Sequence, residues 1–211
     1  MFEDRKDAGN RLADALKEYR DRNVLVLAIP KGGVEVGYCV ARYLDAQFSV
    51  LVARKLPFPY DQEAGFGAIA EDGSIFLVKE AGNWVLKSEI DGIIETQKDE
   101  IKRRIAVLRR GKPLPTIEDR TVILVDDGIA MGSTMRTAIM LCQKAGARKI
   151  VVAVPVTGEK TAREIGKLVD EIVVLIIPRP FYAVAQVYKN WYDVSDQEVI
   201  AIMDRWHHAK C

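Results

Sequence analysis

Short runs of consecutive apolar residues alternate along this chain with segments whose apolar residues recur at helical spacing, and this alternation constrains the fold most. Such runs are typical of strands buried on both faces of a parallel sheet. The predicted strands comprise residues 24–29, 48–53, 121–125, 149–154 and 171–177. The predicted helices comprise residues 4–20, 34–45, 88–110, 133–145 and 159–168. Strands that alternate with helices favour an α/β fold with a doubly wound, mainly parallel sheet.

Two segments depart from the alternation. Residues 54–74 are rich in glycine, proline and acidic residues, so we expect a long loop there, or a hairpin into residues 75–78. From residue 178 the chain is rich in proline and aromatic residues, and it ends in a helix capped by Ser195 or Asp196. We therefore divide the chain into a core of residues 1–177 and a small cap of residues 178–211. An aromatic tail that packs as ordinary core is the simpler alternative.

The composition limits the classes of partner. The chain has 211 residues, of which 49% are hydrophobic, and its net charge is +1 at pH 7. This length suits one α/β domain, and the balanced charge gives no electrostatic basis for binding nucleic acid. No apolar run approaches the roughly 20 residues of a membrane span, and no signal-peptide core begins the chain, so we expect a cytoplasmic protein without membrane contact. Cys39 and Cys142 fall within apolar helical patterns, which predicts buried free thiols.

The run that carries most chemistry is Asp126-Asp127-Gly128-Ile129-Ala130-Met131-Gly132-Ser133-Thr134. It follows a predicted strand and opens a predicted helix, which is where α/β folds place anionic ligands. Its small residues let backbone N–H groups approach an anion, and the hydroxyl groups of Ser133 and Thr134 add donors. These features would hold a phosphate monoester.

The two carboxylates that open this run would repel a phosphate, so they need a different ligand. They could accept hydrogen bonds from sugar hydroxyls or orient a hydrated Mg²⁺ ion. Ribose 5-phosphate, with a diol at one end and a phosphate at the other, satisfies both demands. The simpler alternative is a strand-to-helix loop in which Ser133 or Thr134 caps the helix. That alternative does not explain two adjacent acids beside a glycine turn.

Basic segments follow the first two predicted strands. Lys31-Gly32-Gly33 supplies a cation and exposed backbone N–H groups, and in a parallel sheet it emerges at the same edge as the acidic run. Arg54 and Lys55 follow the second strand directly, and two adjacent cations there indicate a nearby anion. An ordinary glycine turn and a solvated edge with extended basic side chains are the simpler alternatives.

The pattern Val-x-Leu-Val-Asp-Asp-Gly-x-Ala-x-Gly-x-Thr over residues 122–134 resembles the signature of the type I phosphoribosyltransferases, which bind 5-phosphoribosyl pyrophosphate (PRPP). The resemblance covers roughly residues 24–195 and is nearest to uncharacterised members whose base is not evident. Met131 departs from the signature, which usually has Thr at that position. One side-chain contact to the phosphate is therefore lost.

This resemblance implies transfer of the 5-phosphoribosyl group of PRPP to a nitrogenous base, with Mg²⁺ as cofactor and release of pyrophosphate. The implied catalytic residues are Lys31, Arg54, Lys55, Asp126 and Asp127, and the two aspartates would also hold the metal through water or PRPP hydroxyls. The implied ligand-binding residues are Gly32, Gly33, Gly128, Ala130, Met131, Gly132, Ser133, Thr134 and Phe181.

The resemblance also implies how the segments around the site behave. The loop with Lys31 would cradle pyrophosphate, often through a cis peptide bond that does not involve proline as the second residue. Residues 55–72 would form a flexible loop that closes over pyrophosphate, with Gly65 and Gly67 among its hinges. Residues 178–211 would form a hood that binds the base, by stacking Phe181 or Tyr182 on it. A C2-type homodimer is a further expectation.

Two other functions remain open at this point. A PRPP-sensing regulatory protein with little or no catalysis would keep the same fold, and Met131 mildly favours it. A phospho-receiver or flavodoxin-like module would also place acids after a strand, but receiver acids normally come from separate strands near the N-terminus. The basic residues of 102–110 share their helix with acidic residues, and we expect a solvated face rather than a nucleic-acid surface.

Overall fold

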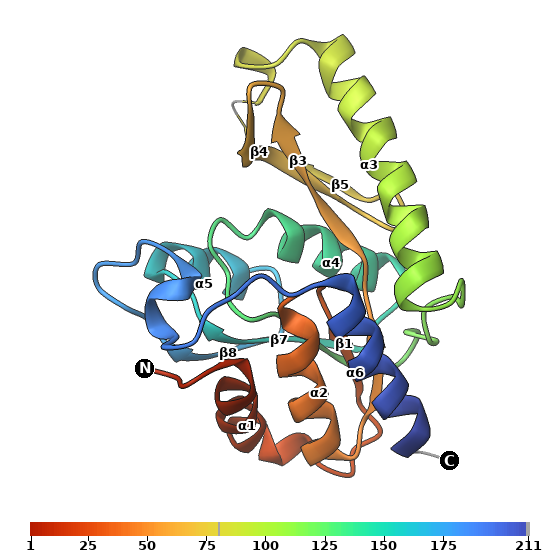
Figure 1. Cartoon of the computed structure of the whole chain (residues 1–211), viewed down its shortest axis with the longest axis vertical. Helices are drawn as coiled ribbons and strands as arrows, with labels where there is room; N and C mark the ends of the chain where they lie inside the picture. Colours follow the sequence, from red (N-terminus) through yellow and green to blue (C-terminus); the bar gives the residue numbers. More distant parts are fainter. Residues whose placement is uncertain (80, 210–211) are drawn as a thin grey trace.

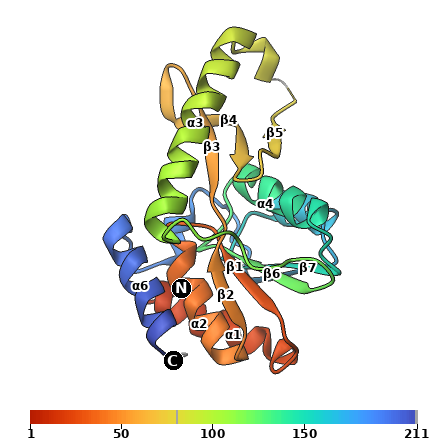
Figure 2. The ribbon, with the colours of Figure 1, turned by 90° about the vertical axis from the view of Figure 1, so that its right-hand side faces the viewer.

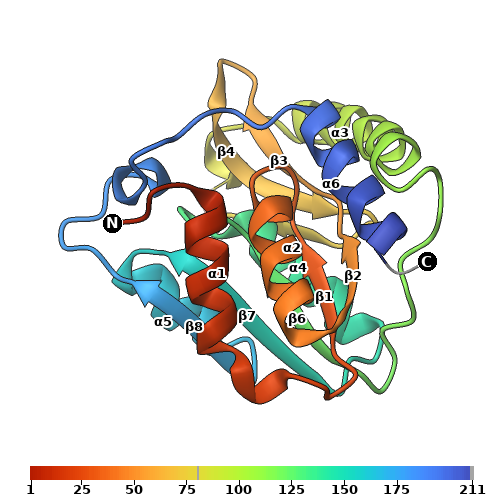
Figure 3. The same ribbon diagram turned by 60° about the horizontal axis from the view of Figure 1, so that its bottom comes forward.

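The central sheet consists of five parallel strands in the order β2-β1-β6-β7-β8 (Figures 1 and 3). The computed structural model describes residues 1–79 and 81–209. The strands are β1 (Leu25–Ala28), β2 (Gln47–Val50), β6 (Thr121–Val125), β7 (Lys149–Val156) and β8 (Glu171–Ile176). The predicted doubly wound parallel sheet is confirmed. β2 lies on one side of β1, and β6, β7 and β8 follow on the other side, so the strand order reverses between β1 and β6.

Helices cover both faces of this sheet. Figure 3 shows α1, α2 and α6 on the face toward the viewer, and α4 and α5 on the opposite face. Their bounds are α1 (Arg5–Ala15), α2 (Gly33–Leu44), α4 (Ser133–Lys144), α5 (Glu159–Gly166) and α6 (Asp196–Ala209). Short 3-10 helices comprise Lys17–Tyr19, Ala81–Asn83 and Val184–Val187. The predicted helices therefore exist, with ends that differ by a few residues.

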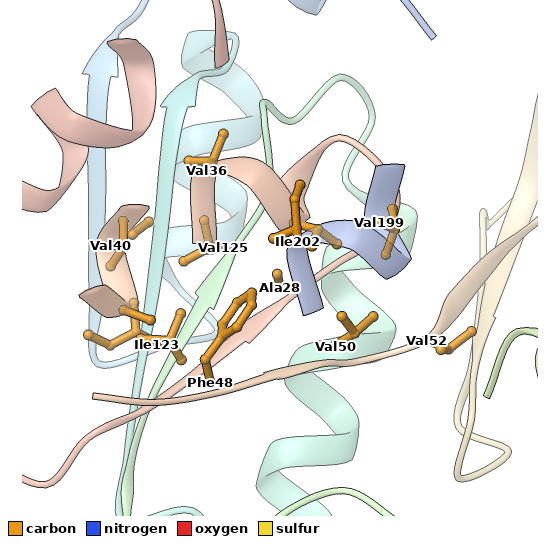
Figure 4. Packing of buried hydrophobic residues seen from close by; sticks show 14 of the residues in the cluster. Ala28, Val36, Val40, Phe48, Val50, Val52, Ile123, Val125, Val199 and Ile202 are labelled. Atoms are coloured by element: carbon orange, nitrogen blue, oxygen red, sulfur yellow. The ribbon is translucent and has the colours of Figure 1, made fainter. Parts of the chain in front are cut away.

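One buried cluster joins α2 and α6 to the sheet. Val36 and Val40 of α2 and Val199 and Ile202 of α6 belong to it together with Ile123 of β6 (Figure 4). Burying each such side chain contributes roughly 1.5–3 kcal/mol relative to leaving it in water. Because the spacing of the apolar residues in α2 matches the helical repeat, this burial fixes the orientation of α2 and the place where it begins.

A second, three-stranded antiparallel sheet projects from the core with the long helix α3 (Figures 1 and 2). It contains β3 (Ala53–Phe58), β4 (Asp61–Ala70) and β5 (Ile75–Leu77), and α3 comprises Lys87–Leu108. We call these four elements the arm. The expected hairpin into residues 75–78 is confirmed, because β4 pairs antiparallel with β5. The alternative of a long loop over residues 54–74, including a loop at 55–72, is wrong, because most of the segment pairs as strands.

β3 and β4 contain glycine and proline, which are uncommon in strands and made the sequence resemble a loop. β3 is an edge strand, and its pairing with β4 shifts register on either side of Pro57, where a missing backbone N–H is tolerated. Several apolar residues of these strands are buried, with Leu56 and Phe66 fully inaccessible to water. Phe58 packs its ring against Phe66 at 5.6 Å between centroids. This burial, rather than local propensity, stabilises these strands.

The basic residues near the end of α3 form the expected solvated face only in part, because Lys102, Arg103 and Arg110 are exposed whereas Arg104 and Arg109 are not. Arg104 and Arg109 are both buried, at 8% and 6% exposure. Arg109 donates from Nη1 to the carbonyl of Val50 at 3.0 Å and to Oε1 of Glu71 at 2.9 Å, and its Nη2 forms an ion pair with the same carboxylate. The pair therefore connects α3 to the ends of β2 and β4, where the arm joins the core.

The two described cysteines are free thiols, as expected. Cys142 is buried and Cys39 is half-buried. Burial raises the pKa of the Cys142 thiol to about 12, so this group stays protonated. Within residues 1–79 and 81–209, no helix has both the length and the apolar composition that a membrane crossing requires.

We expect Glu71→Gln to lower the free energy of unfolding by about 3 kcal/mol, because it leaves the buried Arg109 guanidinium without a counter-charge. Asp99→Asn is the control. It removes an ion pair with Lys102 in which both side chains are more than three-quarters exposed, and such pairs contribute less than about 1 kcal/mol. Urea denaturation of both variants measures the difference, and equal losses would contradict the role of the buried pair.

Candidate functional site

Two loops meet where the strand order reverses. β1 and β6 pair in parallel with Ala28 opposite Val125, so the turn before α2 and the acidic run after β6 leave the sheet side by side. A Cβ atom on Gly33 would lie 2.8 Å from the Cα atom of Asp126, and one on Gly32 would lie 1.8 Å from Oδ2 of Asp127. Only glycine permits this approach. Reversal points of this kind are where open α/β sheets bind ligands.

The turn before α2 has the backbone form that the resemblance implies. The peptide bond between Pro30 and Lys31 is cis. Lys31 itself is partly exposed, and its Nζ lies 4.0 Å from Oδ1 of Asp196 at the start of α6. The turn lies beside the acidic run, as predicted, and its lysine is directed to the start of α6 in the hood.

The two carboxylates of the acidic run have different surroundings. Oδ1 of Asp126 accepts a hydrogen bond from the backbone N–H of Asp127 at 2.8 Å, and Asp126 lines the cleft described below. Burial raises the pKa of the Asp126 carboxyl well above its usual range, and the neighbouring Asp127 charge raises it further. Burial also raises the pKa of Asp127, but the Arg5 guanidinium opposes that rise.

Arg5 is the most important residue that sequence reasoning missed. It lies at the start of α1 with 3% exposure, and its Nε donates to Oδ2 of Asp127 at 2.8 Å. The sequence did contain a signal. Arg5 precedes Ala8 and Leu12 on the buried face of an amphipathic helix, and a charge in that position indicates a buried partner.

Two threonines beyond the predicted run hold it against β7. The backbone N–H of Ile129 donates to the carbonyl of Val156 at 2.9 Å, and the buried hydroxyl of Thr157 donates to the carbonyl of Ile129 at 2.8 Å. The hydroxyl of Thr161 donates to the carbonyl of Ala130 at 3.0 Å. These bonds fix the carbonyl groups away from the cleft, which leaves the N–H groups at the start of α4 available to a ligand.

A cleft of about 350 Å³ opens beside the acidic run. Its lining joins the run to the arm and to the hood, and it comprises Lys55, Ala64, Gly65, Gly67, Asp126, Gly128, Ile129, Ala130, Met131, Gly132, Ser133, Thr134 and Val184. One cation, one carboxylate and the N-terminus of α4 therefore face one cavity. A phosphate at the helix N-terminus and a hydroxyl at Asp126 are both chemically suited to it.

Several predicted residues lie outside this cleft. Arg54 points to α3, where its Nε donates to Oε1 of Gln97 at 3.0 Å. Phe181 packs against Gly158 and the cluster around Phe2. Tyr182 is 83% exposed. The hood residue that lines the cleft is Val184, which covers Gly128, so the expected aromatic contact from the hood is not formed here.

A hollow of about 440 Å³ lies at the other end of α4, beside Leu141 and Lys144. Its lining is mostly apolar, with Pro113, Leu114 and Pro115 along one side. It contains neither a helix N-terminus nor the glycine turns that bind an anion. We therefore take the smaller cleft as the functional site.

A doubly wound sheet whose reversal point carries an acid pair and a glycine-rich helix start is the arrangement of a phosphoribosyltransferase. The family model of the phosphoribosyl transferase domain matches residues 2–189. The chain belongs to this family.

Relatives in Mycobacterium tuberculosis, from the strains CDC 1551 and H37Rv, are 39% identical over 209 residues. Their names mark phosphoribosyl transferase activity as unproven. The match covers 98% of this chain but 47% of each relative, so the chain spans about half the length of these proteins.

Solved structures agree with the fold. The crystal structure of TT1426 from Thermus thermophilus has 34% identity and a TM-score of 0.81, and the match covers 98% of this chain and 99% of that one. AQ2163 from Aquifex aeolicus has 14% identity and a TM-score of 0.51, with 81% of this chain and 73% of that one covered. The second likeness supports the fold alone.

We expect Gly32→Ala to lower the free energy of unfolding by about 2–3 kcal/mol, because the new Cβ would overlap the Asp127 carboxylate and displace Arg5. Gly92→Ala is the matched control, since nothing lies within 4 Å of a Cβ at that position of α3. It should stabilise the chain by about 0.5–1 kcal/mol through helix propensity. Equal changes in the free energy of unfolding for the two variants would contradict the close approach of Gly32 to Asp127.

Proposed function

We propose that this chain transfers the 5-phosphoribosyl group of PRPP to a nitrogenous base and releases pyrophosphate. One observation carries the proposal. The Asp126 carboxylate, the N-terminus of α4 and Lys55 line a single cleft at the point where the strand order reverses. This arrangement matches a ligand with a sugar diol between two phosphate-bearing ends. Family membership supports the same conclusion.

Each group of the cleft has a role in this proposal. The N–H groups of residues 131–134 and the hydroxyls of Ser133 and Thr134 would bind the 5-phosphate. Asp126 would accept hydrogen bonds from the ribose hydroxyls. Lys55 and the backbone of the turn around Lys31 would bind the pyrophosphate group. Arg54 is left out, because its guanidinium contacts Gln97 on α3.

The reaction would break the bond between the anomeric carbon and the pyrophosphate oxygen, and the electron pair would leave with pyrophosphate. A ring nitrogen of the base would form the new bond to that carbon and lose its proton to an oxygen of the departing pyrophosphate. The transition state resembles a sugar cation, which the Asp126 carboxylate would stabilise electrostatically. Closure of the arm over the cleft would exclude water, which otherwise hydrolyses the cation.

The residues fit a Mg²⁺ ion that is held mainly by the substrate. Among the described residues, no group of three or more His, Cys, Asp and Glu side chains could form a complete protein site. Mg²⁺ commonly keeps several waters and takes only one or two carboxylates beside substrate phosphates. Asp126 would hold it through water or PRPP hydroxyls, and the ion would neutralise charge on the departing pyrophosphate.

Calorimetric titration with PRPP tests the proposal directly. We expect binding that requires Mg²⁺, and Asp126→Asn should weaken it about tenfold to a hundredfold, because hydrogen bonds to a charged group are lost. Asp99→Asn on exposed α3 should bind as the wild type does. No binding at millimolar PRPP would refute the proposal. Binding without transfer to any purine, pyrimidine or pyridine base would instead favour a PRPP sensor.

Met131 offers a second test, because it lines the cleft and is 66% exposed. We expect Met131→Thr to tighten PRPP binding about threefold to tenfold, since a hydroxyl would add one hydrogen bond to the phosphate. Met140→Thr, an exposed methionine on α4 outside the cleft, serves as the control. Equal affinities for wild type and Met131→Thr would place the phosphate elsewhere.

A further inference from the structure

Arg5 is a buried cation that contacts segments far apart in the sequence. Its Nε donates to Oδ2 of Asp127, and its Nη1 donates to the carbonyl of Tyr192 at 2.9 Å. The centre of its guanidinium lies 4.0 Å from the ring centroid of Trp191 and 5.3 Å from that of Tyr192. A guanidinium enclosed between a carboxylate and an aromatic face is held in one orientation.

Asp127 is enclosed from its other sides as well. Its carboxylate lies against Gly32, where a Cβ would approach Oδ2 to 1.8 Å. Its backbone carbonyl accepts a hydrogen bond from the hydroxyl of Tyr188 in the hood at 2.6 Å. The side chain of Asp127 is only 14% exposed, and the lining of the cleft includes Asp126 but not Asp127. Of the two adjacent acids, Asp126 therefore lines the cleft and Asp127 does not.

We propose that Arg5 is a positioning residue, which holds the Asp127 carboxylate outside the cleft and leaves Asp126 as the acid of this pair that faces the ligand. The inference rests on the proposed function for the identity of that ligand. Its physical basis is the repulsion that a second free carboxylate would exert on the phosphates of PRPP. Arg5 neutralises one acid and, through Trp191 and Tyr192, makes the hood part of the support of the site.

The test compares PRPP affinity and stability in a double-mutant cycle. Arg5→Met should weaken PRPP binding about tenfold, because it releases an unpaired charge beside the cleft. Asp127→Asn should cost about threefold or less, against about tenfold or more for Asp126→Asn. The double variant Arg5→Met/Asp127→Asn should recover most of the affinity that Arg5→Met loses, a rescue that a purely structural role would not produce. Arg11→Met, an exposed arginine on the same helix, is the control.

Two results would overturn the inference. One is a loss for Asp127→Asn as large as that for Asp126→Asn, and the other is a double variant that binds no better than Arg5→Met. If the wild type binds no PRPP, the proposed function fails. The contact between Arg5 and Asp127 is then tested by urea denaturation of the same variants. For Arg5→Met and Asp127→Asn, the unfolding equilibrium constant of the double variant should then differ about tenfold or more from the value expected for two independent substitutions. Additive effects would refute the contact even where Arg5→Met alone folds poorly.

Discussion

The parallel pairing of β1 with β6 is the constraint on which the site depends. It brings two loops that are separated by about ninety residues of intervening chain to the same edge of the sheet. The loops then approach so closely that Gly32 and Gly33 leave no room for a side chain beside Asp126 and Asp127. Anion-binding N–H groups and a carboxylate thus lie together, although α2 and α4 cover opposite faces of the sheet. The strand order therefore determines the chemistry of the cleft.

The segment before α1 and the hood meet behind this edge and hold it in place. The backbone N–H of Phe2 donates to the carbonyl of Val187 at 2.7 Å, and that of Lys189 donates to the carbonyl of Phe2 at 2.9 Å. The Phe2 ring packs on Tyr188 at 5.4 Å between centroids. Because Tyr188 also binds the backbone of Asp127, the segment before α1 and the hood form one support under the acidic run. The hood thus contacts the site through Val184 in the cleft and through Tyr188 behind the acidic run.

The strands and helices that depend on apolar periodicity could be predicted from the sequence. The contacts that depend on pairing between distant segments could not. The strands at 121–125 and 171–176 and the helix at 133–144 follow from local patterns, because burial on the sheet selects their residues. For residues 54–74 the sequence left a long loop and a hairpin into residues 75–78 open, because Pro57 is tolerated in β3 only through its edge position and register shifts. The cleft-lining role of Val184 had no local signal, because it depends on how the hood folds back over Gly128.

The remaining misses share a physical cause. Arg5 with Asp127, and Arg109 with Glu71, are buried ion pairs between residues that lie 122 and 38 positions apart. Each occurs where a segment outside the parallel sheet joins the core. The first pair lies where α1 and the hood meet the acidic run, and the second lies where the arm begins. A buried pair is costly to desolvate and stable only with both partners present, so it favours one docking geometry over its alternatives. Apolar burial builds the sheet and its helices, whereas these two pairs fix how the hood and the arm are set around the cleft.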